Sequence, residues 1–164
     1  TKLTLTPSYY FGGKQGLFYL TGNSDIYLDN RFSVASEIGY YLGNINGNET
    51  FTHNHSLFFG GSYHCVKEQA DFFLAFQPGV SYTQANGTVY NQENVKASVN
   101  PLISFNAGLN YYISNFFHFF ISGRYIYGQQ NNYPVVNLSE FRVSAGLGFN
   151  IHVLKKNNKK SCLE

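Results

Sequence analysis

The chain has 164 residues, enough for one domain, and its formal net charge is only +2. Apart from a Lys-rich tail the basic residues are scattered, which leaves no basic surface for nucleic acid. Charged residues make up 12%, about half the usual share, yet no stretch approaches the ~18 consecutive apolar residues of a membrane helix. Aromatic residues reach 18%, with 14 Tyr and 16 Phe. Low charge without helical hydrophobicity favours a β protein.

Eight segments show the alternation of apolar and polar side chains that is typical of β-strands. Polar turns rich in Gly, Asn and Ser separate them. The connections alternate between longer and short, as in an antiparallel up-and-down arrangement. The expected strands are residues 3–10, 17–27, 32–42, 52–66, 72–83, 103–112, 117–128 and 141–153.

The last expected strand, residues 141–153, carries the clearest pattern, with an apolar residue at every odd position. At ~3.3 Å per residue and a tilt of ~40°, a strand of this length rises about 30 Å and can cross a bilayer. Its even positions carry side chains that suit the crowded interior of a narrow barrel: Arg142, Ser144, Gly146, Gly148, Asn150 and His152.

Two short stretches repeat each other, residues 26–32 (IYLDNRF) and residues 111–117 (YYISNFF). Each combines an aromatic strand end, an Asp/Ser-Asn turn and a new aromatic strand, so both are expected to be tight hairpin turns. Aligning the two stretches fixes the weak pattern of the second strand. The alignment predicts that Phe18, Leu20 and Ile26 face outward and that Tyr19, Asn23, Asp25 and Tyr27 face inward.

These patterns predict an all-β fold: an eight-stranded antiparallel up-and-down transmembrane β-barrel with a polar lumen filled by side chains. Residues 1–153 form its single domain. Residues 154–164 form a charged tail, in which Leu163 and Glu164 look like residues left by cloning before a purification tag. With short turns on the periplasmic side, the extracellular loops are residues 11–16, 43–51, 84–98 and 129–137.

Outward-facing aromatic residues fall into two belts near the two ends of the strands, where Tyr and Phe are expected to meet lipid headgroups. The belt near the short turns contains Phe32, Phe72, Tyr111, Phe117 and Phe119. The belt near the long loops contains Tyr9, Tyr40, Tyr82, Tyr125 and Tyr127.

Five charged residues within the expected strands take the inward phase: Asp25, Glu37, Arg124, Glu140 and Arg142. They are expected to form an ion-pair and hydrogen-bond network that fills a lumen too narrow for water to flow through. Glu37 is expected to pair with Arg124, with Arg142 or with both, because a desolvated charge persists only with a partner. The alternative is a small gated pore lined by the same groups.

The FRVSAGLGFNIHV end and the repeated aromatic turns resemble the small eight-stranded outer-membrane β-barrels of the OmpA/OmpX type, of the sort described as porin-like. The resemblance covers roughly Leu3 to Val153. It implies a monomeric, lipid-embedded protein of the bacterial outer membrane that has a structural role, or an adhesive or binding role toward host or surface ligands through its extracellular loops. Such proteins often end on an aromatic residue, whereas here residues 154–164 follow. The chain shows neither a signal peptide nor an initiating Met, which favours an exported, mature chain.

The histidines give weaker signals. His53 and His55 share a face near an extracellular strand end, and with His64 they could suggest a metal, but a His-x-His pair alone does not define a site. His118 and Ser122 lie four residues apart and face the packed lumen, where no nucleophile, base and orienting acid are expected to converge. We therefore expect no metal, no cofactor and no enzyme activity.

A competing class is a soluble lipocalin-like ligand-binding barrel, which also has eight antiparallel strands but is apolar inside and polar outside. Glu37, Arg124 and Arg142 at strand centres favour the opposite arrangement. Cys65 lies in a strand and Cys162 in the tail, so the two are expected to be unpaired.

Overall fold

The computed structural model describes residues 1–11, 16–44, 50–87, 95–130 and 135–151, with side chains from residue 16 onward and at Thr1. None of the described residues belongs to a helix long and apolar enough to cross a membrane. The strands are β1 (Lys2–Phe11), β2 (Leu17–Tyr27), β3 (Phe32–Asn44), β4 (Phe51–Lys67), β5 (Ala70–Ala85), β6 (Ser98–Tyr112), β7 (Phe117–Gln130), β8 (Val136–Asn137) and β9 (Glu140–Asn150).

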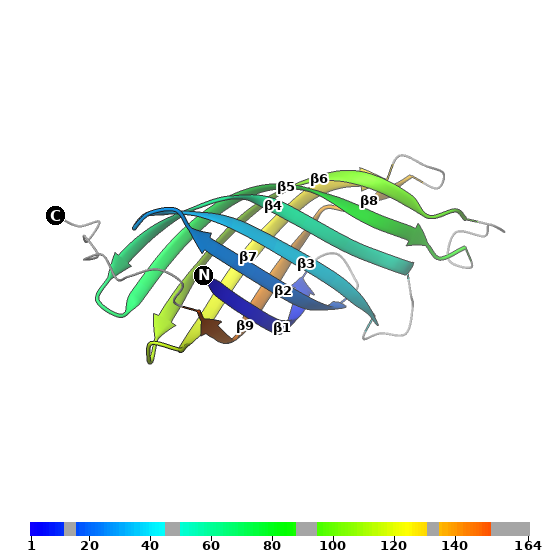
Figure 1. Ribbon diagram of the computed structural model, residues 1–164. Coiled ribbons are helices and arrows are strands. Elements are labelled where there is room, and N and C mark those ends of the chain that lie inside the picture. The colour runs from blue at the N-terminus through cyan, green and yellow to red at the C-terminus, as the bar shows by residue number, and fades with distance from the viewer. Residues whose placement is uncertain (12–15, 45–49, 88–94, 131–134, 152–164) are drawn as a thin grey trace.

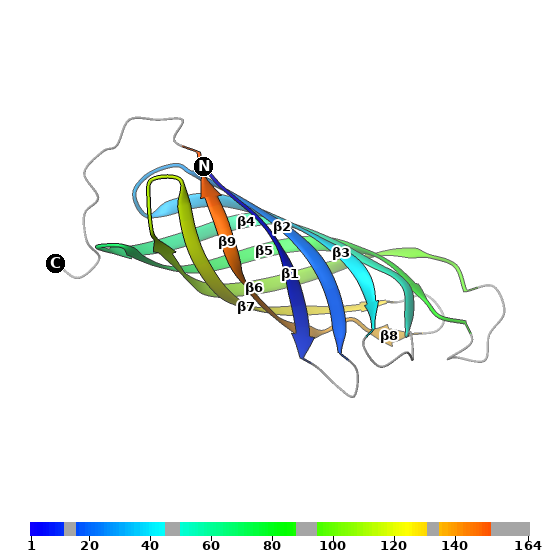
Figure 2. The same ribbon diagram turned by 90° about the horizontal axis from the view of Figure 1, so that it is seen from below.

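The long strands pair in a closed ring. Each strand from β1 to β7 pairs antiparallel with the next, β7 also pairs with β9, and β9 pairs with β1. The two-residue strand β8 pairs with the end of β7. Figure 1 shows the long strands running obliquely around one elongated cylinder, and Figure 2 shows β1 beside β9, where the ring closes. The predicted eight-stranded antiparallel barrel is confirmed.

Buried and exposed positions alternate on the predicted faces. In β9, Arg142 is buried while Phe149 is exposed. In β2, Tyr19 is fully buried, whereas Leu20 and Ile26 are exposed, as the alignment of the two turns predicts. Apolar side chains therefore cover the outside of the barrel and charged side chains lie inside, the reverse of a soluble ligand-binding barrel.

The aromatic residues expected in the two belts lie on the outward face wherever their side chains are described. The side chain of Tyr9 is outside the described part of the chain, and the contact of the belts with lipid headgroups stays a prediction. The exposed members are Phe32, Phe72, Tyr111, Phe117, Phe119, Tyr40, Tyr82, Tyr125 and Tyr127.

β1, β3, β4, β5 and β7 extend one or two residues beyond the expected bounds at one or both ends. These extensions and the earlier start of β6 place residues 11, 43–44, 51, 84–85 and 98 of the expected loops in strands. Three further differences are larger or change the assignment. β9 ends at Asn150 rather than Val153, and residues 152–153 lie outside the described part. β6 begins earlier than expected, at Ser98, because it stays paired with β5 as far as Thr83. The segment 129–137, expected as a polar loop, instead contains the end of β7 and the whole of β8. A two-residue strand has no alternation by which a sequence pattern could reveal it.

The two repeated turns have the same hydrogen bonds. In the first turn, the N–H groups of Leu28 and Asp29 donate to the carbonyl oxygen of Phe32 at 2.9 and 3.3 Å. Oδ1 of Asp29 accepts from the N–H groups of Arg31 and Phe32 at 2.6 and 2.7 Å. The second turn repeats each bond at the equivalent position, with Oγ of Ser114 in place of the carboxylate. The repeat in the sequence is therefore also a repeat of structure.

The wall of the barrel is irregular near the long loops. β4, β5 and β6 are the longest strands, with 17, 16 and 15 residues. The β3–β4 ladder stops at the pair Gly39 and Ser56, although both strands continue. The β4–β5 ladder has a register shift between Phe51 and His53. Such irregularities re-aim the side chains beside them, which here are those of β4 on the outward face.

Asp29 offers a test of the repeated turn. Hydrogen bonds from the N–H groups of Arg31 and Phe32 stabilise the carboxylate and lower the pKa of Asp29 below its usual value. A pKa lowered by folding contributes stability above the pKa of the unfolded chain, and that contribution is lost as the pH falls through the folded pKa. We expect Asp29→Ala to lower the free energy of unfolding more at about pH 7 than at about pH 2, measured by urea titration in detergent micelles.

Asp29→Ser is the matched control, because the hydroxyl of Ser114 makes the same bonds in the second turn. The serine variant should unfold at a higher urea concentration than the alanine variant at every pH. Equal stability of the two variants would show that the side-chain bonds do not hold the turn.

Candidate functional site

The interior of the barrel contains three layers of side chains along its axis. The layer nearest the long loops is apolar, the middle layer holds two ion pairs, and the layer nearest the short turns is a hydrogen-bond cluster around Asp71. We call these the apolar layer, the ion-pair layer and the Asp71 cluster. Because inward positions of all strands meet in the lumen, each layer combines residues that are far apart in the sequence.

Arg124 of β7 pairs with Glu37 of β3 across the lumen. Nη2 of the arginine lies 2.6 Å from Oε2 of the glutamate, and the two side chains are 4% and 6% exposed. Nη1 donates to Oγ of Ser104 at 2.5 Å. The guanidinium carbon lies 5.0 Å from the centre of the Phe58 ring, within the range of a cation–π contact.

Arg142 of β9 pairs with Glu140, two residues earlier on the same strand. Its Nη1 donates to Oγ of Ser56 at 3.0 Å, and its guanidinium lies 3.8 Å from the centre of the Tyr19 ring. The hydroxyl of Tyr19 donates to Oε2 of Glu140 at 3.1 Å. A Cβ atom at Gly39 would lie 2.6 Å from Nη1 of Arg142, so glycine at this position makes room for the guanidinium.

The register of the barrel explains why each arginine has its own acid. Arg124 and Arg142 lie directly opposite each other in the β7–β9 ladder. Like charges opposite each other destabilise a strand pair, and removal from water makes an unpaired charge still more costly. Glu37 and Glu140 each neutralise one of the two, so the ion-pair layer as a whole is neutral.

Asp25, the fifth charged residue expected in the network, lies apart from the two ion pairs. Its Oδ1 accepts a hydrogen bond from Ser33 at 3.2 Å, and no arginine nitrogen of the described residues lies within ion-pair distance of it. The structure thus joins four of the five charged residues in two pairs and places Asp25 beside the Asp71 cluster.

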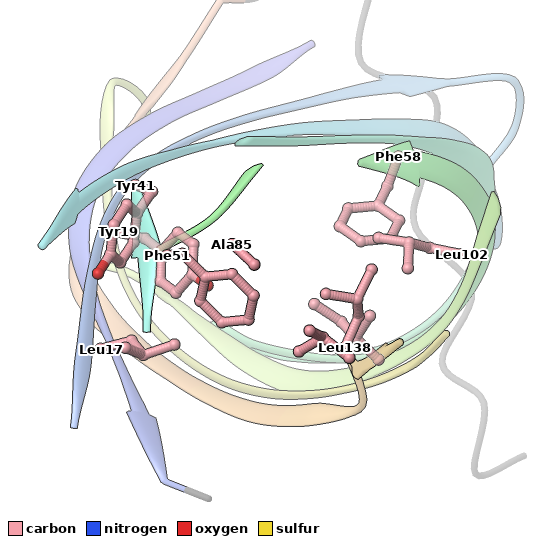
Figure 3. Close-up of a cluster of buried hydrophobic side chains, with 10 residues drawn as sticks. Leu17, Tyr19, Tyr41, Phe51, Phe58, Ala85, Leu102 and Leu138 are labelled. Carbon is pink, nitrogen blue, oxygen red and sulfur yellow. The ribbon is translucent and has the colours of Figure 1, made fainter. Parts of the chain in front are cut away.

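The apolar layer fills the lumen near the long loops. Figure 3 shows these side chains pointing into the ring of strands from several sides. The alternating pattern predicted a polar lumen, and neither Val136, which falls in the expected loop 129–137, nor Leu138 was expected inside it. The N–H group of Leu138 donates to the carbonyl oxygen of Gly128 at 3.0 Å, which holds this segment against the end of β7. The buried members are Leu17, Tyr19, Tyr41, Phe51, Phe58, Ala85, Leu102, Ile126, Val136 and Leu138.

The Asp71 cluster is the densest group of hydrogen bonds in the described lumen. Oδ2 of Asp71 accepts from the hydroxyl groups of Tyr27 and Tyr112, each at 3.0 Å. Oδ1 lies 3.0 Å from Nδ1 of His64. Nε2 of His64 lies 2.9 Å from Oγ of Ser33. The buried carboxylate of Asp71, on β5, therefore joins residues of β2, β4 and β6 directly.

The hydroxyl of Ser33 has one proton and lies within hydrogen-bond distance of both Asp25 and the His64 ring. Donation to Oδ1 of Asp25 leaves the serine oxygen as the acceptor for an N–H group at Nε2 of His64. Ser33 therefore connects Asp25 to the Asp71 cluster.

Ser33, His64 and Asp71 are connected in the order of a Ser–His–Asp triad. The expectation that no nucleophile, base and orienting acid converge was made for His118 and Ser122, and the connection among Ser33, His64 and Asp71 was not expected. Ser33 is only 2% exposed, and both His64 and Asp71 are fully buried. The cluster is therefore a buried polar network.

A small cavity of about 40 Å³ lies in the lumen, lined in part by Asp25, Gln77, Asn106 and Arg124. The side-chain oxygens of Gln77 and Asn106 have no hydrogen-bond partner among the described residues. A buried water needs about 10–15 Å³, so the cavity has room for a few waters that would satisfy these groups. A cavity of this size is not an aqueous channel.

His53 and His55 lie on the outward face of β4 near the long loops, whereas His64 of the same strand faces the lumen. We call the two outward residues the rim histidine pair. Their ring centres are 5.7 Å apart; His55 stacks on Tyr40 at 4.4 Å, and His53 lies 6.4 Å from Tyr82. The described residues contain no group of three or more His, Cys, Asp or Glu placed to hold a metal ion. The three histidines considered from the sequence therefore do not share one site.

Eight antiparallel strands in a closed ring, apolar outside and charged inside, define the fold of a small outer-membrane β-barrel. Solved structures of such proteins share it. The N-terminal β-barrel domain of Pseudomonas aeruginosa OprF has a TM-score of 0.66 and 16% identity, over 92% of this chain and 96% of that chain. Neisserial surface protein A (NspA) has a TM-score of 0.65 and 14% identity, over 92% and 95%.

The outer membrane enzyme PagL also has this fold, with a TM-score of 0.55 and 16% identity over 92% of this chain and all of that chain. No protein-family model and no curated protein matches the chain. The expected resemblance to small outer-membrane barrels is thus confirmed as a likeness of fold. Because proteins named as a surface protein and as an enzyme share that fold, the fold alone does not decide the function.

Asp71 was not expected in the lumen, because the fifth expected strand begins at residue 72 and Asp71 precedes it in the turn. The alternation of side chains along β5 could have revealed it. Phe73 and Ala75 face inward, so the residue two positions before Phe73, which is Asp71, is also expected to face inward if the strand extends that far. The paired start of β5 at Ala70 includes Asp71 in the strand. By the same alternation Ser33 falls on the inward face of its strand, but its partners could not be read from the pattern.

The pair of Arg124 and Glu37 can be tested by a double-mutant cycle. Glu37→Gln and Arg124→Gln should each destabilise the barrel by about 3–5 kcal/mol, because each leaves the other charge buried and unpaired. The double variant should lose less than the sum of the two single losses. Free energies of unfolding in urea, measured in lipid vesicles, give the coupling.

Glu37→Gln combined with Arg142→Gln is the control cycle, since Arg142 is paired with Glu140. Its coupling should be smaller than that between Glu37 and Arg124. Equal coupling in the two cycles would mean that the charges interact through the general field of the lumen and not as specific pairs.

Proposed function

We propose that this chain is an integral protein of the bacterial outer membrane with a structural or surface-binding role, exerted at its extracellular end rather than through its lumen. The filled lumen is the observation that carries the proposal. Two ion pairs and an apolar layer occupy the interior, and the cavity on the other side of Arg124, toward the Asp71 cluster, has a volume of about 40 Å³. An eight-stranded barrel is just wide enough to be filled in this way.

The same observation argues against the alternative of a small gated pore. Opening a path through the lumen would require both arginines to leave their acids and the apolar layer to separate as well, because the layers lie one behind another along the axis. Each of these steps has a high free-energy cost, because it exposes buried apolar surface or leaves a charge unpaired. A single flexible side chain could not act as the gate, since the obstruction involves residues from most strands of the ring.

Recording currents across planar lipid bilayers tests the closed lumen. The reconstituted protein should give no steady single-channel openings. A variant in which Tyr19, Phe58 and Leu138 are all changed to alanine should leak, because these substitutions remove large side chains from the apolar layer, including the two rings that face the arginines of the ion-pair layer. Large, steady currents from the unaltered protein would overturn the proposal, and migration on unheated gels would verify that both proteins are folded.

The extracellular end is the part of the barrel that offers an exposed surface for recognition. The strands β4, β5 and β6 are the longest, and β5 and β6 remain paired as far as Thr83 and Ser98. Loops carried by a rigid strand pair are common binding elements. The name of the structural neighbour NspA describes it as a surface protein, which supports this role by analogy of fold.

Shortening the connection between β5 and β6 tests surface binding. Residues 86–97 should be replaced by a short Asn-Gly turn, sparing Ala85, which belongs to the apolar layer, and Ser98, which pairs with Thr83. We expect bacteria that display the shortened protein to attach less to a basement-membrane matrix than bacteria that display the full chain. Equal attachment, with equal amounts of folded protein on the surface, would leave the structural role as the function.

A further inference from the structure

We propose that the rim histidine pair binds the phosphate group of an outer-leaflet lipid. The proposal rests on the outer-membrane placement made above, but the site itself is built from described residues of β3, β4 and β5. His53 and His55 lie on the outward face, between Tyr40 and Tyr82, and these two tyrosines are about half exposed.

The backbone fixes the position of the His55 ring. The β3–β4 ladder stops at Gly39 and Ser56, and the next N–H group of β3 on this edge, that of Tyr41, donates to Nδ1 of His55 at 3.2 Å. The imidazole thus replaces a ladder partner, and its face is stacked on Tyr40 with an angle of 20° between the ring planes. The ring is held on two sides.

This contact also sets which nitrogen carries the proton. A neutral imidazole has one N–H group, and because Nδ1 of His55 accepts a hydrogen bond, the proton lies on Nε2. Nε2 is on the side of the ring away from the β3 backbone, so His55 presents a donor to the exterior. The register shift between Phe51 and His53 turns the second imidazole toward the first, at a ring-centre distance of 5.7 Å.

The chemistry around the pair suits an anion. The exposed acidic side chains among the described residues are Asp29 and Glu68, and both lie in short turns at the opposite end of the barrel. Near the pair, Gln84 lies opposite His53 in the ladder, and its side-chain amide donates to the carbonyl oxygen of Val95. Imidazole N–H and phenol O–H groups offer donors to a phosphate, which needs only donors.

The position of the pair favours a lipid as the source of the phosphate. Tyr40 and Tyr82 flank the histidines, and amphipathic aromatic residues on the outward face of a barrel lie at the level of lipid headgroups. A phosphate at this level belongs to a lipid of the outer leaflet. A metal would require further ligands, and the described residues provide no third one.

The test measures binding to the whole protein in non-ionic detergent micelles. Bis-phosphorylated lipid A is the probe, and the side-chain nitrogen resonances of His53 and His55 are recorded by NMR during titration. We expect both sets of resonances to shift in a saturable way with bis-phosphorylated lipid A and to stay unchanged with the dephosphorylated lipid. The double variant His53→Gln/His55→Gln should bind the lipid about tenfold more weakly or worse, measured by native mass spectrometry.

Gln129→Ala is the matched control, because Gln129 is an exposed polar residue at the same end of the barrel, on β7. This variant should bind like the unaltered protein. Equal shifts with the dephosphorylated lipid, or equal affinity of the double variant, would overturn the proposal. If inorganic phosphate bound as tightly as the lipid, the conclusion that the bound phosphate group belongs to a lipid would be wrong. None of these outcomes depends on conductance or attachment, so the site can fail without affecting the proposed closed lumen.

Discussion

The opposition of Arg124 and Arg142 in the β7–β9 ladder is the constraint on which the interior of this barrel depends. Two guanidinium groups side by side and buried in the lumen would repel each other, so each must have an acid within contact distance. Glu37 reaches Arg124 from the far wall, and Glu140 reaches Arg142 from the same strand. The charges of the ion-pair layer thereby tie β3, β7 and β9 into one arrangement.

The ion pairs also support the apolar layer. Tyr19 and Phe58 belong to that layer, and their rings face the guanidinium groups of Arg142 and Arg124 at 3.8 and 5.0 Å. A cation over an aromatic face is stabilised most when both are removed from water, as they are here. Tyr19 adds a hydrogen bond to Glu140. The two layers are therefore coupled, and loosening one would remove packing or charge balance from the other.

How far the sequence predicted this structure depends on the length of each pattern. The alternation over the long strands predicted the faces of Tyr19, Leu20 and Arg142 because a single period governs a whole strand. The choice of Glu140 rather than Glu37 as the partner of Arg142 could not be predicted, since it depends on the stagger of strands around the ring. Val136 was missed because a two-residue strand shows no period.

The candidate site was less predictable than the fold, and the histidines of β4 show why. Side chains alternate between the two faces of β4, so His64, at an even position, faces the lumen, and the rim histidine pair, at odd positions, faces outward. This difference could be predicted from the sequence. The partners of His64 could not, because Ser33 and Asp71 reach it only through ring closure. The pairing of β3 with β4 ends at Gly39 and Ser56, which lets the His55 ring contact the β3 backbone, and no sequence pattern predicts where this pairing ends.

The buried His64 and the outward-facing rim histidine pair differ in how strongly each is tied to the stability of the barrel. His64 is fixed by buried bonds to Ser33 and Asp71, so a change at any of these positions leaves a buried polar group without a partner and lowers stability. His53 is exposed, and replacing it removes little packing, whereas His55 accepts a hydrogen bond from the N–H group of Tyr41 and stacks on Tyr40. At the rim, chemical specificity can therefore vary at position 53 with little change in the free energy of folding, whereas changes at Ser33, His64 or Asp71 weaken the interactions between strands inside the barrel.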